Sequence, residues 1–367
     1  MSSRPVIAGF GALGLFWGAW AALLPSVQRA THASKSELGI ALLCVAVGSI
    51  PSTLLAGWLI DHFGTVVLPV SICAFGAAVT LPGLARSVPV LALALVAAGA
   101  TSGAMDVAVN ARVAAIEVET GKRRMHLAHA TYSAGVVLGA VATGLARQAG
   151  AGREHVLLAV AAAIVAIGLA NRGRGPSGSP GEAKLRLSRA LVVLGVVALV
   201  AFVVEGGLES WSALFLERDL AASPAVSALG PGLFALTMAL GRASGHVVGG
   251  VVGDRRLLGA GALAAAAGAA LAASSHATAL ALAGFALAGA GISVAAPILF
   301  GAAGRGLPGT QQGSAVGTVT TIGYAGFLIG PALMGAVSGA AGLRAGLAML
   351  AATALLLAAG SRLLDAG

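Results

Sequence analysis

Residues 190–216 have the sequence ALVVLGVVALVAFVVEGGLESWSALFL, an apolar run whose only charged residues are Glu205 and Glu209. An α-helix needs about 20 residues, at ~1.5 Å each, to cross ~30 Å of hydrocarbon. This run is therefore long enough to span a bilayer as one helix. A carboxylate inside a bilayer costs free energy, so each acid in such a run indicates a functional site or a specific partner.

The composition of the whole chain agrees with this local pattern. Of 367 residues, 58% are hydrophobic and 10% are charged, whereas a soluble domain has roughly 25% charged residues. The formal charge of +9 does not indicate nucleic-acid binding, because only 4% of residues are aromatic and the basic residues lie in short clusters between apolar runs. Most of the 54 glycines lie inside apolar runs, where small residues allow close helix packing in lipid.

The sequence predicts an all-α membrane protein with twelve transmembrane helices. The predicted spans are 6–26, 38–60, 66–85, 88–116, 127–148, 154–171, 190–216, 226–252, 257–274, 277–303, 313–340 and 343–361. We expect the first run to be a retained helix rather than a signal peptide, because it continues through Trp17 and Trp20.

A polar segment divides these runs into six and six. Residues 171–189 have the sequence NRGRGPSGSPGEAKLRLSR, whose Pro, Gly and Ser content is typical of a linker. We therefore predict a six-helix bundle over 1–170, a cytoplasmic linker over 171–189 and a second six-helix bundle over 190–367.

The basic residues predict the orientation. With the amino terminus inside, 13 of the 22 Lys and Arg residues are cytoplasmic, 7 are external and 2 lie within helices. Cytoplasmic loops carry an excess of Lys and Arg, so both termini are expected on the cytoplasmic side.

The two halves share landmarks at a nearly constant offset of 191–193 residues. These are Trp20 with Trp211, Gly39 with Gly230, the G-x-x-x-D of Gly57 and Asp61 with that of Gly250 and Asp254, and Tyr132 with Tyr324. A duplicated six-helix unit is typical of transporters whose site lies between the repeats.

Six plus six helices, the central loop and the two G-x-x-x-D motifs resemble the major facilitator superfamily. Three stretches resemble its MosC-like group: MDVAVN at 105–110 continuing to HATYS at 129–133, Glu205-Gly206 with Trp211-Ser212, and GYAGFLIGP at 323–331. The resemblance implies a transporter in the bacterial cytoplasmic membrane, with a central cavity and substrate exchange by alternating access. It implies no particular substrate.

The run 88–116 predicts one polar stripe. Asp106, Asn110 and Glu117 fall within about 40° of one another at 100° per residue. The stripe either faces a cavity for substrate or protons, or forms interhelical hydrogen bonds with Glu117 solvated. Arg112 points away from it, and we expect Arg112 to form a structural ion pair.

The run 190–216 carries Glu205 near mid-depth and Glu209 nearer the outer end, with Gly206-Gly207 between them. Paired glycines permit bending, and either acid could exchange a proton as its surroundings change. For Glu209, an exposed position at the helix end explains the acid equally well.

Arg242 lies in the run 226–252 and needs a partner because it is always charged. It binds either an acidic substrate or a buried carboxylate. His246, one turn later, is more often a packed side chain than a switch. We expect Arg242 to neutralise one acid, and either Asp106 or Glu205 to carry the proton, with Glu205 preferred.

The remaining candidates lie elsewhere in the two halves. His129 and Tyr132, with Tyr324 at the repeat-related position, are candidates for the substrate pathway, with packing as the alternative. Gly57, Asp61, Gly250 and Asp254 are predicted to gate the conformational change. Both carboxylates are expected at cytoplasmic helix ends, beside a helix N-terminus or a basic partner.

The sequence thus predicts a monomeric secondary active transporter of a small polar or amphipathic solute, coupled to protons. An uncoupled facilitator and a non-transporting membrane sensor or scaffold are the alternatives. No nucleotide-binding motif and no metal-ligand spacing occurs, so no cofactor or metal is expected, and no local nucleophile motif indicates an enzyme.

Overall fold

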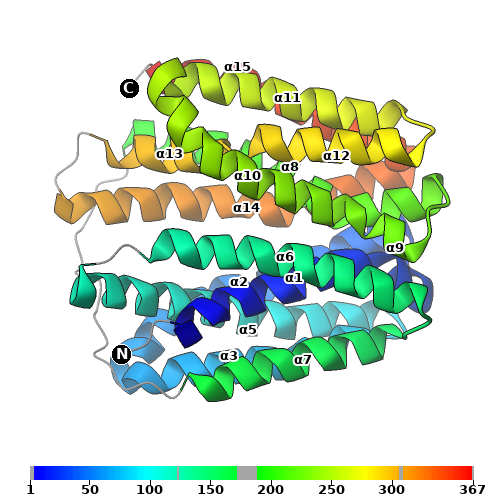
Figure 1. The fold of residues 1–367 in the computed structure, drawn as a ribbon, viewed down its shortest axis with the longest axis horizontal. Coiled ribbons are helices and arrows are strands. Elements are labelled where there is room, and N and C mark those ends of the chain that lie inside the picture. Colours follow the sequence, from blue (N-terminus) through cyan, green and yellow to red (C-terminus); the bar gives the residue numbers. More distant parts are fainter. Residues whose placement is uncertain (1–3, 122–123, 172–187, 306–308, 366–367) are drawn as a thin grey trace. The chain divides into compact units, whose positions relative to one another are not determined.

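The computed structural model describes residues 4–121, 124–171, 188–305 and 309–365, and all regular structure in these ranges is helical. The described chain forms two compact units (Figure 1). One comprises Met1–Pro180 with Ser223–Gly232, and the other comprises Gly181–Ala222 with Leu233–Gly367. The predicted linker falls almost entirely outside the described residues, at 172–187.

The helices of the first unit run in chain order as follows: α1 (Arg4–Thr31), α2 (Lys35–Phe63), η1 (Gly64–Val66), α3 (Val67–Ala78), α4 (Leu81–Leu84), α5 (Val88–Thr120), α6 (Met125–Gln148) and α7 (Arg153–Ala170). The short α9 (Pro224–Ser227) also belongs to this unit.

The second unit also contains a divided span, formed by α12 and α13. It contains α8 (Arg189–Asp219), most of α10 (Leu229–Val252), α11 (Asp254–Ser274), α12 (Thr278–Ile292), α13 (Ala295–Gly304), α14 (Gly309–Ala341), α15 (Leu343–Gly360) and η2 (Ser361–Asp365).

Ten helical stretches in the described residues are long and apolar enough to cross a membrane. The chain is therefore an all-α membrane protein. One of the ten, Lys35–Leu84, has 50 residues and contains α2, α3 and α4 together, whereas α6 is not among the ten. Each of the twelve runs predicted from the sequence overlaps a helix of the structure.

Proline accounts for three interruptions that the sequence analysis did not place. A proline ring clashes with the carbonyl four residues earlier and cannot donate to it. The carbonyls of Ala78, Ser227 and Ser293 each precede a proline by four residues, and helices end at or beside all three. The last break divides one apolar span into α12 and α13.

Glycines bring two helix pairs into direct backbone contact. In the first unit, a methyl group on Gly18 of α1 would overlap the carbonyl oxygen of Val136 in α6. In the second unit, a methyl group on Gly326 of α14 would overlap the carbonyl oxygen of Leu199 in α8. The first and fifth predicted spans therefore pack closely in each half, as small residues in lipid allow.

An arginine caps the C-terminus of α11. Arg344, at the start of α15, donates from Nη1 to the carbonyl oxygens of Ala273 and Ser275, each at 2.8 Å. A cation is favoured at a helix C-terminus, where carbonyls lack helical partners.

Candidate functional site

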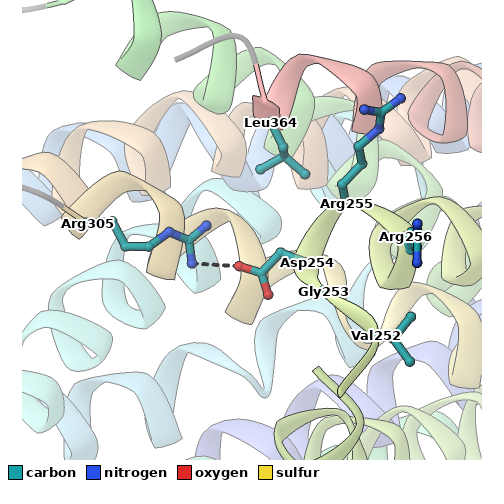
Figure 2. A pocket seen from close by; sticks show the side chains of 7 residues that line it. All are labelled: Val252, Gly253, Asp254, Arg255, Arg256, Arg305 and Leu364. Atoms are coloured by element: carbon teal, nitrogen blue, oxygen red, sulfur yellow. Dashed lines mark ion pairs between the residues drawn. The ribbon is translucent and has the colours of Figure 1, made fainter. Parts of the chain in front are cut away.

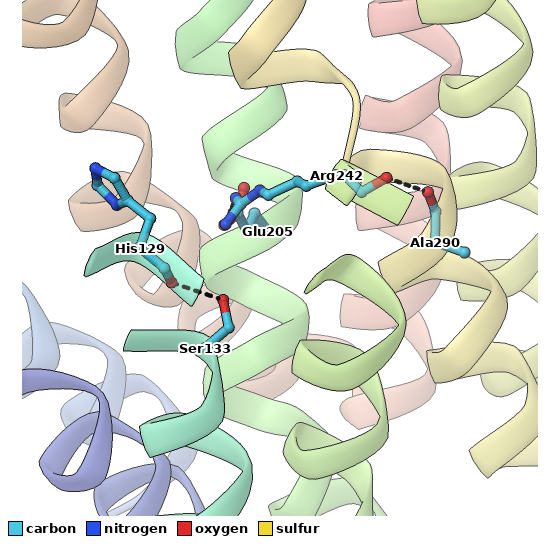
Figure 3. A network of polar contacts seen from close by, with 6 residues as sticks. His129, Ser133, Glu205, Arg242 and Ala290 are labelled. Atoms are coloured by element: carbon cyan, nitrogen blue, oxygen red, sulfur yellow. Dashed lines mark hydrogen bonds and ion pairs between the residues drawn. The ribbon is translucent and has the colours of Figure 1, made fainter. Parts of the chain in front are cut away.

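An ion pair with a buried acid lies near the middle of α8. Arg242 Nη2 of α10 donates to Glu205 Oε1 at 3.1 Å, and Figure 3 draws the two side chains together. The Glu205 side chain is 6% exposed and that of Arg242 is 31% exposed. The prediction that Arg242 neutralises an acid is therefore confirmed, and the acid is Glu205.

The helix around Glu205 is packed on every side. All residues from Ala201 to Leu208 are buried. A methyl group on Gly207 would lie 2.7 Å from Leu350 Cδ1 of α15, and one on Gly206 would lie 3.1 Å from the Phe327 ring of α14. In this structure α8 is continuous through both glycines, which serve close packing, so bending at this point stays a prediction.

Glu209 lies one helical turn after Glu205 and is half-buried. Within the described residues it forms no ion pair, because the arginine nearby is bound to Glu205. Two acids on one helix face with a single arginine form a charge-unbalanced group. Such a group is stabilised by a proton or by a further cation.

The divided span α12–α13 packs against Gly241, the residue before Arg242. A methyl group on Gly241 would overlap Ser293 Oγ and lie 3.1 Å from the carbonyl oxygen of Ala290. The Ser293 hydroxyl donates to that carbonyl at 2.6 Å, and Ala290 is labelled in Figure 3. Sequence reasoning missed this break, although Pro297, four residues after Ser293, was the available signal.

Asp106 and Asn110 form a polar pair in α5 of the first unit. Asn110 Nδ2 donates to Asp106 Oδ1 at 3.1 Å and to the Asp106 carbonyl at 2.9 Å. Both side chains are half-buried, near the middle of a 33-residue helix. This part of the predicted stripe is one local unit, in which the amide holds the carboxylate.

Glu117, at the end of that stripe, has a different role. Its Oε1 accepts hydrogen bonds from the backbone N–H groups of Arg124 and Met125, where α6 begins. It therefore caps a helix N-terminus, as a carboxylate favours. Arg112 pairs with Glu119 at 3.0 Å, which confirms the expected structural ion pair.

The aromatic and histidine candidates divide between the units. The ring of His129 in α6 lies edge-on to Phe10, with centroids 5.2 Å apart, and the Ser133 hydroxyl donates to the His129 carbonyl at 3.3 Å (Figure 3). Tyr132 is half-buried in the same helix. In α14, Tyr324 is 46% exposed and contacts the rings of Phe202 and Phe327. The side chain of His246 lies outside the described residues.

The predicted gating acids occupy opposite helix ends. Asp254 begins α11, and its Oδ2 lies 2.6 Å from Arg305 Nη1 (Figure 2), so it has both the N-terminus and the basic partner that we expected. Asp61 lies in the last turn of α2, at a helix end as expected. A methyl group on Gly57 would meet nothing within 4 Å, and the surroundings of Gly250 lie outside the described part of the chain.

These features define an all-α, multi-pass membrane protein with ionisable groups held inside its helices. Residues 6–249 match the family model of the Major Facilitator Superfamily. The chain belongs to this superfamily, and it is therefore a transporter rather than an enzyme.

Relatives and solved structures agree. The chain is 32% identical over 355 residues to an uncharacterized MFS-type transporter of Yersinia pestis, covering 95% of this chain and 92% of that one. It is 31% identical over 357 residues to the membrane protein MosC of Rhizobium meliloti, covering 96% and 87%, which confirms the MosC-like resemblance.

Two solved structures have the same fold. One is a bacterial homologue of the human lysosomal transporter Spinster in an inward-facing, occupied conformation, with a TM-score of 0.79, 16% identity and coverage of 99% and 96%. The other is the nucleoside transporter NupG, with a TM-score of 0.79, 13% identity and coverage of 100% and 99%. At these identities the likeness concerns the fold alone.

Proposed function

We propose that this chain is a proton-coupled secondary active transporter that moves a small polar or amphipathic solute by alternating access. The observation that carries the proposal is the group of Glu205, Arg242 and Glu209 in the second unit. Two acids and one arginine inside a membrane helix pair are expensive to maintain without a function. A sensor or scaffold has no need for them.

The pairing changes which acid we prefer as the proton carrier. An acid bound to arginine stays ionised, whereas an acid without a cation is more easily protonated in an apolar wall. Glu205 is bound to Arg242, so we now prefer Glu209 or Asp106 to Glu205. Ionised Glu209 competes with Glu205 for Arg242, and protonated Glu209 leaves Arg242 to Glu205.

Arg242 also suits a solute with an acidic group. About a third of its side chain is exposed, and a guanidinium has five N–H donors, so it can bind an anion while it keeps its contact with Glu205. A proton moving down 100 mV releases ~2.3 kcal/mol, which supports roughly 50-fold accumulation or extrusion. One titrating carboxylate is therefore enough for coupling.

We further propose twelve crossings in two related halves. The stretch Lys35–Leu84 would be about 75 Å long as one helix, far more than one ~30 Å crossing, so it must cross twice. The α6 helix packs along α1 through glycines, as α14 packs along α8, which supports counting α6 as a span. We also propose that the protein is a monomer in the bacterial cytoplasmic membrane and that both of its termini are cytoplasmic.

The test begins with a thermal-shift screen of purified protein against inositol-like compounds, amino sugars and antibiotics. A ligand that stabilises the protein is then followed into liposomes with an imposed pH gradient. We expect accumulation by the parent protein, and loss of accumulation with retained exchange of labelled for unlabelled solute in Glu209→Gln or Asp106→Asn. Glu205→Gln is the matched comparison on the same helix face.

The alternatives predict other results. Equal accumulation by all three variants and the parent protein contradicts coupling through these acids. Transport that does not depend on the imposed pH gradient identifies an uncoupled facilitator. Ligand binding without any transport identifies a sensor.

A further inference from the structure

Two hydroxyl groups of α2 lie against α5 in the first unit, at the position of a glycine. A methyl group on Gly103 of α5 would lie 2.7 Å from Ser52 Oγ and 2.9 Å from Thr53 Oγ1. It would also lie 2.8 Å from the carbonyl oxygen of Ser49. Three oxygen atoms of α2 therefore converge on one position of α5, and a side chain at this position would displace them.

The polar pair of α5 follows this glycine on the same side of the helix. At about 100° per residue, Asp106 and Asn110 lie within roughly 60° of Gly103 around the helix axis. Asp106 comes three residues after Gly103, which is about 4.5 Å along the axis, and helical side chains lean toward the N-terminus of their helix. The Asp106 carboxylate thus leans toward the level at which the two hydroxyl groups of α2 meet α5.

The hydrogen atoms of these polar side chains are donated within their own helices. The hydroxyl groups of Ser52 and Thr53 donate to the Ser49 carbonyl oxygen at 3.0 and 2.7 Å. The Asn110 amide donates to the carbonyl and to the carboxylate of Asp106 at 2.9 and 3.1 Å. These donations leave lone pairs on the two hydroxyl oxygens, on the Asn110 amide oxygen and on the second carboxylate oxygen of Asp106.

The charge of Asp106 is not compensated by a basic side chain. Within the part of the chain that the structure describes, Asp106 forms no ion pair, and Arg112 of the same helix is bound to Glu119 at 3.0 Å. A carboxylate near the middle of a membrane helix costs free energy unless its charge is compensated. Oxygen lone pairs gathered around such a carboxylate attract a cation.

One negative charge with neutral oxygen ligands suits a cation that carries one positive charge. A monovalent ion leaves the group neutral, whereas a divalent ion leaves a net positive charge inside the membrane. Carboxylate, amide and hydroxyl oxygens are ligands of hard cations. No group of three or more His, Cys, Asp or Glu side chains that could hold a metal ion occurs among the described residues. The ligands therefore favour an alkali metal ion over a transition metal.

We propose that Asp106, Asn110, Ser52 and Thr53 bind an alkali metal cation, sodium or potassium, between α2 and α5. The Asp106 carboxylate supplies the negative charge, and the three neutral side chains supply the other protein ligands. The ligands come from two helices, so no local metal motif in the sequence indicates this site. The inference goes beyond the proposed function, and with a cation at Asp106 the coupled proton is carried by Glu209.

The test measures the apparent melting midpoint of the purified full-length protein as sodium chloride or potassium chloride replaces choline chloride at constant ionic strength and pH. It needs no solute and no pH gradient, so its result is independent of the proposed transport. We expect sodium or potassium to raise the midpoint in a saturable manner, because an ion that binds the folded protein stabilises it. Asp106→Asn should abolish the rise, and Thr53→Val should require about tenfold more salt for the same rise.

The matched control is Thr101→Val, which makes the same substitution outside the proposed site. Thr101 lies two residues before Gly103 and about 160° from it around α5. Its hydroxyl donates to two carbonyl oxygens of its own helix, at 2.9 and 3.1 Å. This variant is expected to keep the response of the parent protein. All variants are first compared in choline chloride, and Ser52→Ala replaces Thr53→Val if the latter folds poorly.

Three outcomes overturn the proposal. Equal midpoints of the parent protein in the three salts show that no alkali cation binds. An unchanged rise in Asp106→Asn shows that the cation binds elsewhere on the protein. An equal loss of the response in Thr53→Val and Thr101→Val shows that the hydroxyl groups act through helix packing rather than as ligands.

Discussion

Removing one member of the Glu205–Arg242 pair leaves the other charge inside the membrane without a partner. For Arg242→Gln we expect the protein to lose about 1–3 kcal/mol of stability. Breaking a fully buried pair costs more, and the partial exposure of Arg242 reduces the loss. The double variant Arg242→Gln, Glu205→Gln should recover much of it, because no uncompensated charge remains.

The measurement is the apparent melting midpoint of each variant in detergent. Glu209→Gln serves as the control, since Glu209 forms no ion pair within the described residues. If the double variant melts as low as Arg242→Gln, the arginine contributes through packing rather than through its charge.

For single residues, the sequence identified the charged side chains of the site, but it did not identify which of them pair. Glu205 and Glu209 are four residues apart and share a helix face, so spacing alone could not say which acid meets Arg242. That depends on the rotation and axial offset of α10 against α8. Glu117 shows the same limit, because its capping of α6 depends on a loop conformation that periodicity does not specify.

The glycine contacts make a prediction about helix packing. Gly18→Ala places a methyl group against the backbone of α6, so α1 and α6 must separate and the melting midpoint should fall. Gly317→Ala in α14 is the matched control, because a methyl group there meets nothing within 4 Å. It should keep or raise the midpoint, since alanine favours a helix over glycine by roughly 1 kcal/mol.

The same substitution of glycine by alanine is therefore expected to lower the melting midpoint at Gly18 and to keep or raise it at Gly317. A fall in both variants would indicate that glycine substitutions act through helix flexibility rather than through the contact with Val136.

Helix positions followed from the length of the apolar runs, but helix breaks did not. Prolines at 82, 231 and 297 interrupt their spans, whereas Pro25, Pro51 and Pro331 lie inside continuous helices. Proline is present in both cases, so whether the helix breaks depends on whether neighbouring helices accommodate the displaced carbonyl. A single sequence does not contain that information.

For the whole molecule, Asp61→Asn tests the proposed gating role. We expect it to change the balance between inward- and outward-open states and to lower transport while the solute still binds. The measurements are solute binding by thermal shift and transport in liposomes, with Asp254→Asn as the repeat-related variant. Loss of binding with an unchanged conformational balance would make Asp61 a binding residue instead.

The proposed topology is tested by labelling single cysteines in intact cells. Cys44 and Cys73 are first replaced by serine, and one cysteine is then introduced at Ser179 in the linker or at Ala151 between α6 and α7. A membrane-impermeant maleimide should label Ala151→Cys and not Ser179→Cys, because α7 separates the two positions. Labelling of both would mean that an even number of crossings lies between them.

The arginines at the two ends of α11 have a consequence for the lipid that surrounds the protein. The helix has 21 residues and is about 32 Å long, with Arg255 and Arg256 at one end and Arg344 at the other. Charged side chains at both boundaries leave the helix little room to slide or tilt, so a membrane of another thickness must deform around it. We expect hydrophobic mismatch to lower the melting midpoint in liposomes of 14-carbon or 22-carbon chains compared with 18-carbon chains. The protein would thereby be tuned to membranes of one thickness by the charges at the two ends of α11.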